Sequence, residues 1–171
     1  AKCALVEKKL EKPIFIKLSP DLNKRELSSA IEVMVSEGVN GVIISNTTIS
    51  RADLKNMKNR EQDGGLSGKP LFRLSCEKLL DAYSLAEGEI AFVGVGGISN
   101  VKDAYIKILL GADILQLYSS LALIGPHIVN QINTDLATIC KGEGLQNLKE
   151  ACGSFNSFNK ANQYAEHAVN K

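Results

Sequence analysis

Short apolar runs alternate along this chain with segments whose apolar residues recur at helical spacing. The first run is Ile-Phe-Ile-Lys-Leu at 14–18, which ends at Ser19-Pro20, and further runs occupy 41–44, 90–95 and 112–117. Apolar runs of this length without polar alternation are typical of parallel strands that are covered on both faces. We therefore expect four parallel β-strands.

The intervening segments predict helices. Asn23 and Glu26 form a capping-box pattern, and an apolar stripe follows them up to Gly38. A second helix is expected at about 70–86, a third between Ser99 or Asn100 and Gly111, and a long fourth helix after Gly125, with Pro126 at its first position. The stripes consist of Leu27, Ala30, Ile31, Met34 and Val35 in the first helix, Val101, Ala104, Tyr105, Ile108 and Leu109 in the third, and Ile128, Val129, Ile132, Leu136 and Ile139 in the fourth.

About four β-α units predict an α/β fold, and at this point doubly wound and barrel folds both fit. A (β/α)8 TIM barrel has eight units in about 250 residues, so four units amount to half of one. An open four-stranded sheet is also possible, but the motifs described below favour the C-terminal half of a TIM barrel, with the N-terminal half missing. We expect residues 1–153 to form that half-barrel. Residues 154–171 are rich in Asn, Ser and Lys, and we expect them to be a polar, mobile extension.

The composition excludes several classes of protein. Lys and Arg number 20 against 19 acidic residues, so no strong overall charge favours binding to nucleic acid. No apolar run approaches the roughly 20 residues of a membrane span. Four scattered cysteines and two histidines give little support to a metal site, and buried free thiols are the expectation.

Glycines at the end of the third strand suggest a phosphate site. In Gly94-Val95-Gly96-Gly97-Ile98 the backbone N–H groups could approach an anion at the start of a helix. Tyr118-Ser119 occupies the equivalent end of the fourth strand, and the loops after the last two strands of a barrel often form a shared phosphate site. The alternative for the glycines is a tight turn that requires positive φ.

Lys17 is the one charged residue in the first apolar run. Its ammonium group could point into the mouth of a barrel, where it could form a Schiff base, hold an anion or stabilise negative charge on a cofactor. The alternative is a lysine at a strand edge whose head reaches water.

Hydrogen-bonding residues follow the second strand as Ser45-Asn46-Thr47-Thr48. Asn46 offers a donor and an acceptor that suit a cyclic imide or amide, and Thr can donate to a carboxylate, although turn-forming chemistry also explains these residues. The segment 64–68, Gly-Gly-Leu-Ser-Gly, is either a hinge or a backbone contact to a ligand. The loop 49–69 is expected to be a lid over the substrate, with a solvated linker as the alternative.

Taken together, these motifs resemble class 2 dihydroorotate dehydrogenases. The resemblance runs from about Pro13 to Gly153, and its five motifs occur in the family's order. They are Ile-Lys-Leu-Ser-Pro-Asp-Leu (16–22), Ser-Asn-Thr-Thr (45–48), Gly-Gly-Leu-Ser-Gly-Lys-Pro-Leu (64–71), Gly-Val-Gly-Gly-Ile (94–98) and Gln-Leu-Tyr-Ser (116–119). The segment 147–153 also resembles the end of the family's eukaryotic members.

The resemblance implies a set of site residues. Lys17 would lie near the N1/O2 edge of FMN, and Asn46 and Thr47 would bind dihydroorotate or orotate. No catalytic residue is assigned here, because the base serine of the class lies upstream, in the missing half, and no metal is expected. The remaining residues implied to contact FMN are Ser45, Gly68, Gly97, Tyr118 and Ser119.

The resemblance also implies the activity, which is oxidation of (S)-dihydroorotate to orotate in de novo pyrimidine (UMP) biosynthesis, with a ubiquinone-type quinone as electron acceptor. The missing N-terminal half would be a required partner and would carry the membrane association, so the isolated fragment would be inactive. The expected location is the mitochondrial inner membrane, or the cytoplasmic membrane of a bacterium. The alternatives are a Schiff-base aldolase or isomerase that uses Lys17, and a non-catalytic half-barrel.

Overall fold

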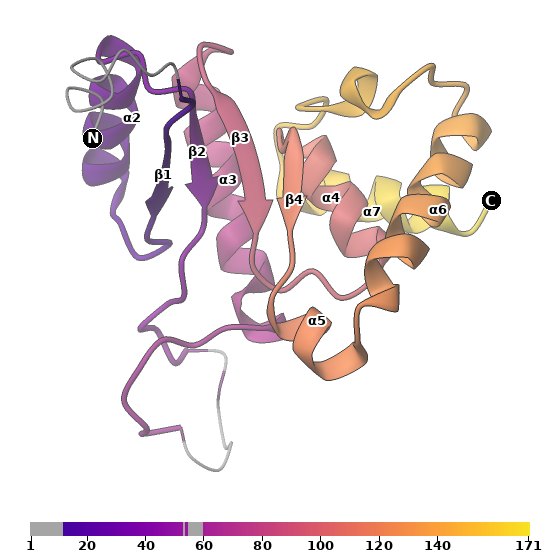
Figure 1. Ribbon diagram of the computed structural model, residues 1–171, viewed down its shortest axis with the longest axis horizontal. Helices are drawn as coiled ribbons and strands as arrows, with labels where there is room; N and C mark the ends of the chain where they lie inside the picture. The colour runs from indigo at the N-terminus through magenta and orange to yellow at the C-terminus, as the bar shows by residue number, and fades with distance from the viewer. Residues whose placement is uncertain (1–11, 53, 55–59) are drawn as a thin grey trace.

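The computed structural model describes residues 12–52, 54 and 60–171 and contains one parallel four-stranded sheet. The strands are β1 (Phe15–Leu18), β2 (Gly41–Ile44), β3 (Ala91–Val95) and β4 (Ile114–Gln116), and they lie side by side in chain order. All three strand pairs are parallel. Their carboxyl ends therefore share one edge of the sheet, toward the bottom of Figure 1.

Helices connect the strands. α2 (Lys24–Ser36) follows β1, and the 3-10 turn η1 (Lys69–Leu71) leads from the long loop into α3 (Phe72–Ala86). α4 (Val101–Leu109) lies between β3 and β4, and α5 (Ser119–Ile124) and α6 (His127–Gly142) follow β4. The chain ends with η2 (Leu148–Ala151) and α7 (Phe158–Val169).

The helices cover one face of the sheet. α3 contacts β2 and β3, and α4 contacts β4, so that both helices lie behind the strands in Figure 1. Val42, Ile44 and Phe92 are buried on this side. On the opposite face, Lys17 pairs with Ile43, and Val93 pairs with Ile114, in one row across the sheet. The two residues at the ends of this row, Lys17 and Ile114, are exposed. A doubly wound fold has helices on both faces, so this one-sided arrangement favours the half-barrel.

The local signals for the first and third helices are confirmed. Asn23 accepts a hydrogen bond from the Glu26 backbone N–H and Glu26 reaches back to Asn23 N, which completes the capping box. Asn100, and not Ser99, is the N-cap residue of α4. Pro126 is the N-cap residue of α6 and not its first helical residue, a shift of one position.

Residues 154–171 do not form the loose polar extension that the sequence predicted. This segment contains α7, which packs on α4 with Ala161, Ala165 and Ala168 buried. Gly153 N and Phe155 N donate to the last carbonyls of α4, at Ile108 and Leu109, with N···O distances of 3.1 Å. The apolar face of α7 consists mainly of alanines, which contribute little to a hydropathy pattern but allow two helices to approach closely.

Among the helices of the described residues, none has both the length and the apolar content that are needed to cross a lipid bilayer.

Candidate functional site

A pocket lies at the carboxyl ends of the four strands. It is lined by residues from the ends of β1, β2, β3 and β4, together with the loop before α3. All eight residues predicted to bind cofactor or substrate line this one pocket. These are Lys17, Ser45, Asn46, Thr47, Gly68, Gly97, Tyr118 and Ser119.

The segment after β2 alternates between buried and exposed side chains. Ser45 and Thr48 are each 2% exposed, whereas Asn46 and Thr47 are exposed beside the pocket. The peptide bond between Ile44 and Ser45 is cis. Asn46 N donates to Leu18 O at 2.8 Å and Ser45 N to Val95 O at 3.1 Å, which ties the segment to both neighbouring strands. The amide of Asn46 and the hydroxyl of Thr47 are thus held on a fixed backbone.

Asp21 from the loop after β1 fixes the same segment from its other side. Its carboxylate accepts hydrogen bonds from Thr48 Oγ1 and from the Ile49 backbone N–H, the latter at 3.0 Å. Thr48 also pairs with Leu66 in an antiparallel bridge, with N···O distances of 3.1 and 2.7 Å. The predicted substrate-binding residues therefore lie between an anchored Thr48 and the sheet.

The glycine segment before α3 packs against Thr47. A Cβ atom on Gly65 would lie 2.0 Å from Thr47 Oγ1, so the backbone of Gly65 occupies the space next to that side chain. Gly68 has φ +72°, and Ser67 lies beside it with its Oγ accepting from Ser119 Oγ at 3.0 Å. This geometry supports a backbone contact at the pocket more than a hinge.

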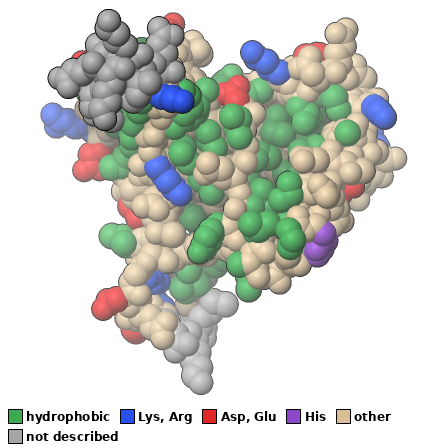
Figure 2. All heavy atoms as spheres, in the orientation of Figure 1, with side chains coloured by type: hydrophobic (Ala, Val, Ile, Leu, Met, Phe, Trp, Pro, Cys, Tyr) green, Lys and Arg blue, Asp and Glu red, His purple; other side chains and the backbone are tan. Residues whose placement is uncertain are grey.

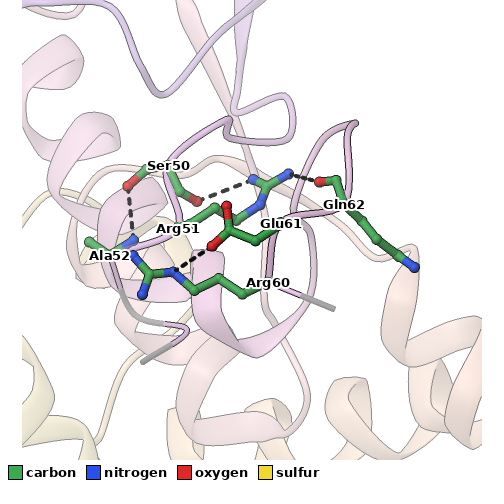
Figure 3. A network of polar contacts seen from close by, with 6 residues as sticks. All are labelled: Ser50, Arg51, Ala52, Arg60, Glu61 and Gln62. Carbon is green, nitrogen blue, oxygen red and sulfur yellow. Dashed lines mark hydrogen bonds and ion pairs between the residues drawn. The ribbon is translucent and has the colours of Figure 1, made fainter. Parts of the chain in front are cut away.

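Arg51 braces the loop that connects these two segments. Its guanidinium donates to the carbonyls of Thr48 and Ser50 on one side, at 3.2 and 3.3 Å, and to those of Gln62 and Gly64 on the other, at 3.2 and 2.6 Å. Figure 3 shows Arg51 between Ser50 and Gln62. Sequence reasoning missed this residue, because its partners are backbone carbonyls that no side-chain motif reveals.

The two strand-end loops predicted to hold a phosphate lie together. Ser120 donates to Ile98 O and so joins the loop after β4 to the glycine turn after β3. Gly97 has φ +74°, and a Cβ there would lie 2.6 Å from Phe72 Cβ and 2.9 Å from Gly68 O. The glycine is thus required by close packing as well as by its backbone conformation.

The start of α4 differs from the anion site that the sequence suggested. Asn100 caps the helix, and Asp103 accepts hydrogen bonds from Ser99 N and Ser99 Oγ at 2.9 and 2.7 Å. A carboxylate therefore already lies at this helix start. The short helix α5 begins at Ser119 within the pocket, and its N-cap residue Tyr118 makes no side-chain capping bond. The donor set that fits a phosphate is accordingly the glycine turn with Ser119, not the N-terminus of α4.

Lys17 is exposed on β1 and lines the pocket. Among the described residues, no carboxylate forms an ion pair with it. The pocket lining contains no Asp, Glu, His or Cys. Lys17 is therefore the one charged group that the described part of the chain places there, and the pocket offers hydrogen bonds and a cation but no carboxylate or imidazole base.

A second polar layer, which the sequence did not reveal, lies under the glycine turn. Ser75 of α3 is fully buried, and its Oγ lies 3.1 Å from Gly96 O. Lys107 of α4 is also fully buried, and its Nζ donates to Ser75 Oγ at 2.8 Å. A signal did exist, because Lys107 is the one charged residue in the otherwise apolar run 104–110.

The remaining expectations about thiols and metals concern residues away from the pocket. Cys76 and Cys140 are buried free thiols, and Cys152 is half-buried. Burial raises the pKa of Cys76, and burial near Asp113 raises the pKa of Cys152 to about 11. These two thiols are therefore protonated at neutral pH. Cys3 lies outside the described residues, within which no group of three or more potential metal ligands occurs.

Comparison with known proteins agrees with this architecture. The family model for dihydroorotate dehydrogenase matches residues 1–140. A protein of Parvibaculum lavamentivorans named dihydroorotate dehydrogenase (quinone) is 45% identical over 150 residues, which cover 88% of this chain and 43% of the relative. The mitochondrial dihydroorotate dehydrogenase (quinone) of Arabidopsis thaliana is 42% identical over 143 residues, which cover 83% of this chain and 31% of the relative.

The structural comparison gives the same result. The ligand-free dihydroorotate dehydrogenase of Eimeria tenella superposes with a TM-score of 0.78 at 33% identity, over 82% of this chain and 39% of that one. This chain thus spans less than half the length of each of these three proteins. The expected fold, part of a (β/α) barrel with four parallel strands, is confirmed. The two relatives that are similar in sequence are both named as quinone enzymes. Sequence, fold and pocket together show that this chain belongs to the dihydroorotate dehydrogenase family.

Proposed function

We propose that the protein containing this chain oxidises dihydroorotate to orotate with FMN as cofactor and a quinone as final electron acceptor, in pyrimidine biosynthesis. The observation that carries the proposal is the convergence of all eight expected residues on one pocket at the strand ends. The names of the relatives support the substrate and the quinone. Family membership favours this activity over a Schiff-base aldolase or isomerase and over a non-catalytic scaffold.

FMN fits the donor set of the pocket. The glycine turn and Ser119 offer backbone and hydroxyl donors for the phosphate group, and Tyr118 and Gly68 lie next to them. Lys17 supplies a cation for the edge of the ring system, and Ser45 lines the same pocket. Bound FMN would supply the ability to accept a hydride from the substrate.

Asn46 and Thr47 are proposed to orient dihydroorotate. Both side chains are exposed, and the hydrogen bonds of Ser45 and Asn46 to the neighbouring strands hold their backbone in place. Such fixed donors and acceptors contribute to catalysis by orienting the reacting atoms. The described residues that line the pocket include no carboxylate or imidazole base, and we propose that proton abstraction depends on a residue outside this chain.

The open face of the sheet supports a requirement for further barrel strands. Figure 2 shows hydrophobic side chains gathered on this face, over the sheet and toward α5 and α6. Ile114 of β4 is 54% exposed and Leu123 of α5 is 86% exposed. We propose that the rest of the barrel covers these side chains, and that association with a mitochondrial or bacterial membrane occurs through a segment outside this chain.

Flavin content and flavin reduction test the proposal. The complete protein is expected to purify with bound FMN, and anaerobic dihydroorotate is expected to bleach the visible flavin absorbance. Lys17→Met should slow this reduction by about 100-fold, because one pre-placed charge at a developing anion has an effect of that order. Lys24→Met, at an exposed position of α2, is the matched control and should leave the rate unchanged. A colourless protein, or a flavin that dihydroorotate does not bleach, would refute the proposal.

A further inference from the structure

A buried lysine lies behind the glycine turn of the pocket. Lys107 on α4 is 0% exposed. Its Nζ lies 2.8 Å from Ser75 Oγ and 5.4 Å from the centre of the Phe72 ring. Burial of an ammonium group without a carboxylate partner costs free energy, and none of the ion pairs among the described residues involves Lys107. Lys107 is not among the residues that line the pocket.

Ser75 connects Lys107 to the backbone of the turn. Its Oγ lies 2.8 Å from Phe72 O and 3.1 Å from Gly96 O. An ammonium group has donors only, so the hydroxyl oxygen must accept from Lys107 and its proton must point to one of the two carbonyls. Lys107 therefore restricts the hydroxyl to donation toward Phe72 O within α3 or toward Gly96 O in the turn.

The turn packs directly on this pair. A Cβ on Gly96 would lie 3.0 Å from Ser75 Oγ, and a Cβ on Gly94 would lie 3.2 Å from Lys107 Cδ. Because Ser75 packs against Gly96 and its Oγ lies within hydrogen-bond distance of Gly96 O, movement of Ser75 would disturb the peptide between Gly96 and Gly97. That peptide carries the Gly97 N–H, which belongs to the donor set assigned to the phosphate.

The other groups around Lys107 do not replace this contact. Cys76 is a thiol whose pKa is raised by burial, and Asp103 on the same helix already accepts two hydrogen bonds from Ser99. Burial lowers the pKa of Lys107, while Cys76 and Asp103 oppose that shift. The polar neighbours of Lys107 Nζ thus include the Cys76 thiol and the Ser75 hydroxyl, and Ser75 is the one that also contacts Gly96 O.

We propose that Lys107 is a positioning residue of the phosphate site, which acts through Ser75 to hold the Gly96–Gly97 peptide in its anion-binding orientation. This inference rests on the proposed binding of FMN. It assigns Lys107 an effect on the phosphate group and none on the ring system. The affinity for FMN should therefore depend on Lys107, whereas the affinity for riboflavin, which lacks the phosphate, should not.

The test compares the dissociation constants of FMN and riboflavin for the complete protein after removal of its flavin. Lys107→Met keeps the length of the side chain but removes the donor, and it should weaken FMN binding by about tenfold. Riboflavin binding should stay within about twofold of the wild type. Ser75→Ala should show the same selective loss, and the double variant should lose no more than the larger single loss, because the two side chains act as one unit.

Lys78→Met is the matched control, since Lys78 is also a buried lysine (9% exposed) but donates to Leu22 O at 2.6 Å, away from the turn. It should leave the FMN-to-riboflavin ratio unchanged. Equal losses for both ligands in Lys107→Met would overturn the inference and leave the proposed function intact. If Lys107→Met does not fold, an unchanged ratio in Ser75→Ala overturns it. A wild type that binds neither ligand overturns the proposed function as well.

Discussion

Arg51 shows how a single side chain can organise a site that it does not line. Its four hydrogen bonds to carbonyl groups connect the segment after β2 with the segment before α3. The same region contains the Thr48–Leu66 bridge and the contact of Gly65 with Thr47. The planar guanidinium presents five N–H donors in a fixed geometry, whereas a lysine has three donors on one nitrogen and an amide has two.

We expect Arg51→Gln to raise the KM for dihydroorotate by about threefold to tenfold, because it loses several hydrogen bonds near Thr47. FMN content should fall less than the affinity for dihydroorotate, since the phosphate donors lie at the ends of β3 and β4. Steady-state kinetics and flavin absorbance measure the two effects. Arg60→Gln is the control, because the ion pair recorded for Arg60 joins it to exposed Glu61 at 3.9 Å. Equal effects of the two substitutions would argue against the role of Arg51.

Glu143 gives a pH-dependent contribution to stability. Hydrogen bonds from Lys171 Nζ, at 2.7 Å, and from Tyr164 Oη lower the pKa of its carboxyl from 4.5. A carboxylate whose pKa is lower in the folded state stabilises that state above its unfolded pKa. This stabilisation is lost as the pH falls through the folded value, below 4.5.

Glu143→Gln should therefore reduce the free energy of unfolding at pH 7 by about 0.5–1 kcal/mol, the range for a partly exposed pair. The difference from the wild type should shrink as the pH falls below 4.5. Urea unfolding of both proteins at pH 7 and at acidic pH measures this. A loss of unfolding free energy that is the same at pH 7 and at acidic pH would contradict the hydrogen bonds assigned to the Glu143 carboxylate.

At the scale of elements, α7 is anchored by small side chains. Ala161 and Ala165 are both 0% exposed, and α7 contacts α3, α4 and α6. Phe158 adds an edge-on ring contact with Phe72 at a centroid distance of 6.2 Å. The phenol of Tyr105 on α4 is close to α7 as well, and burial, with Tyr164 and Glu143 nearby, raises its pKa to about 12.

Ala165→Leu should destabilise the protein by about 1–3 kcal/mol, because the close-packed site leaves no room for three further carbon atoms. Gln163→Leu, which adds a leucine at an exposed position of the same helix, should change stability by no more than about 0.5 kcal/mol. Chemical denaturation of the two variants measures the difference. Equal stability would show that α7 does not pack as described.

The whole molecule has one covered and one open face. Helices pack behind the sheet, whereas the side seen in Figure 2 carries exposed hydrophobic side chains. The outer strands β1 and β4 each have one neighbour within the described sheet, and unpaired strand edges promote association between chains.

We expect the 171-residue chain, produced alone, to associate with itself and to bind a hydrophobic dye. Supplying the remaining barrel strands, as a co-expressed segment or as one longer polypeptide, should reduce both effects because it covers the apolar face. Sedimentation velocity and dye fluorescence measure this. A monomeric chain that binds no dye would contradict the half-barrel interpretation.

The order of the strands and helices and the gathering of the pocket residues follow from local features of the sequence. The spacing of apolar residues and the helix-capping residues are local signals. Residues that directly follow parallel strands must meet at one edge of the sheet. For this reason the order of strands along the chain is enough to bring Lys17, Asn46, Gly97 and Ser119 together. The helix α5 was missed, because the Gly125-Pro126 signal drew attention to the longer helix after it.

Which polar groups are buried, and which partners they contact, depends on the packing of the elements. Lys17, inside an apolar run, is exposed, whereas Lys107, on a helix, is fully buried. The contacts of Arg51 with backbone carbonyls, of Ser75 with Gly96, and of α7 with α4 join segments that are distant in the sequence. Burial and contacts of this kind depend on how the elements pack in three dimensions, and the spacing of residues along one chain does not specify that packing.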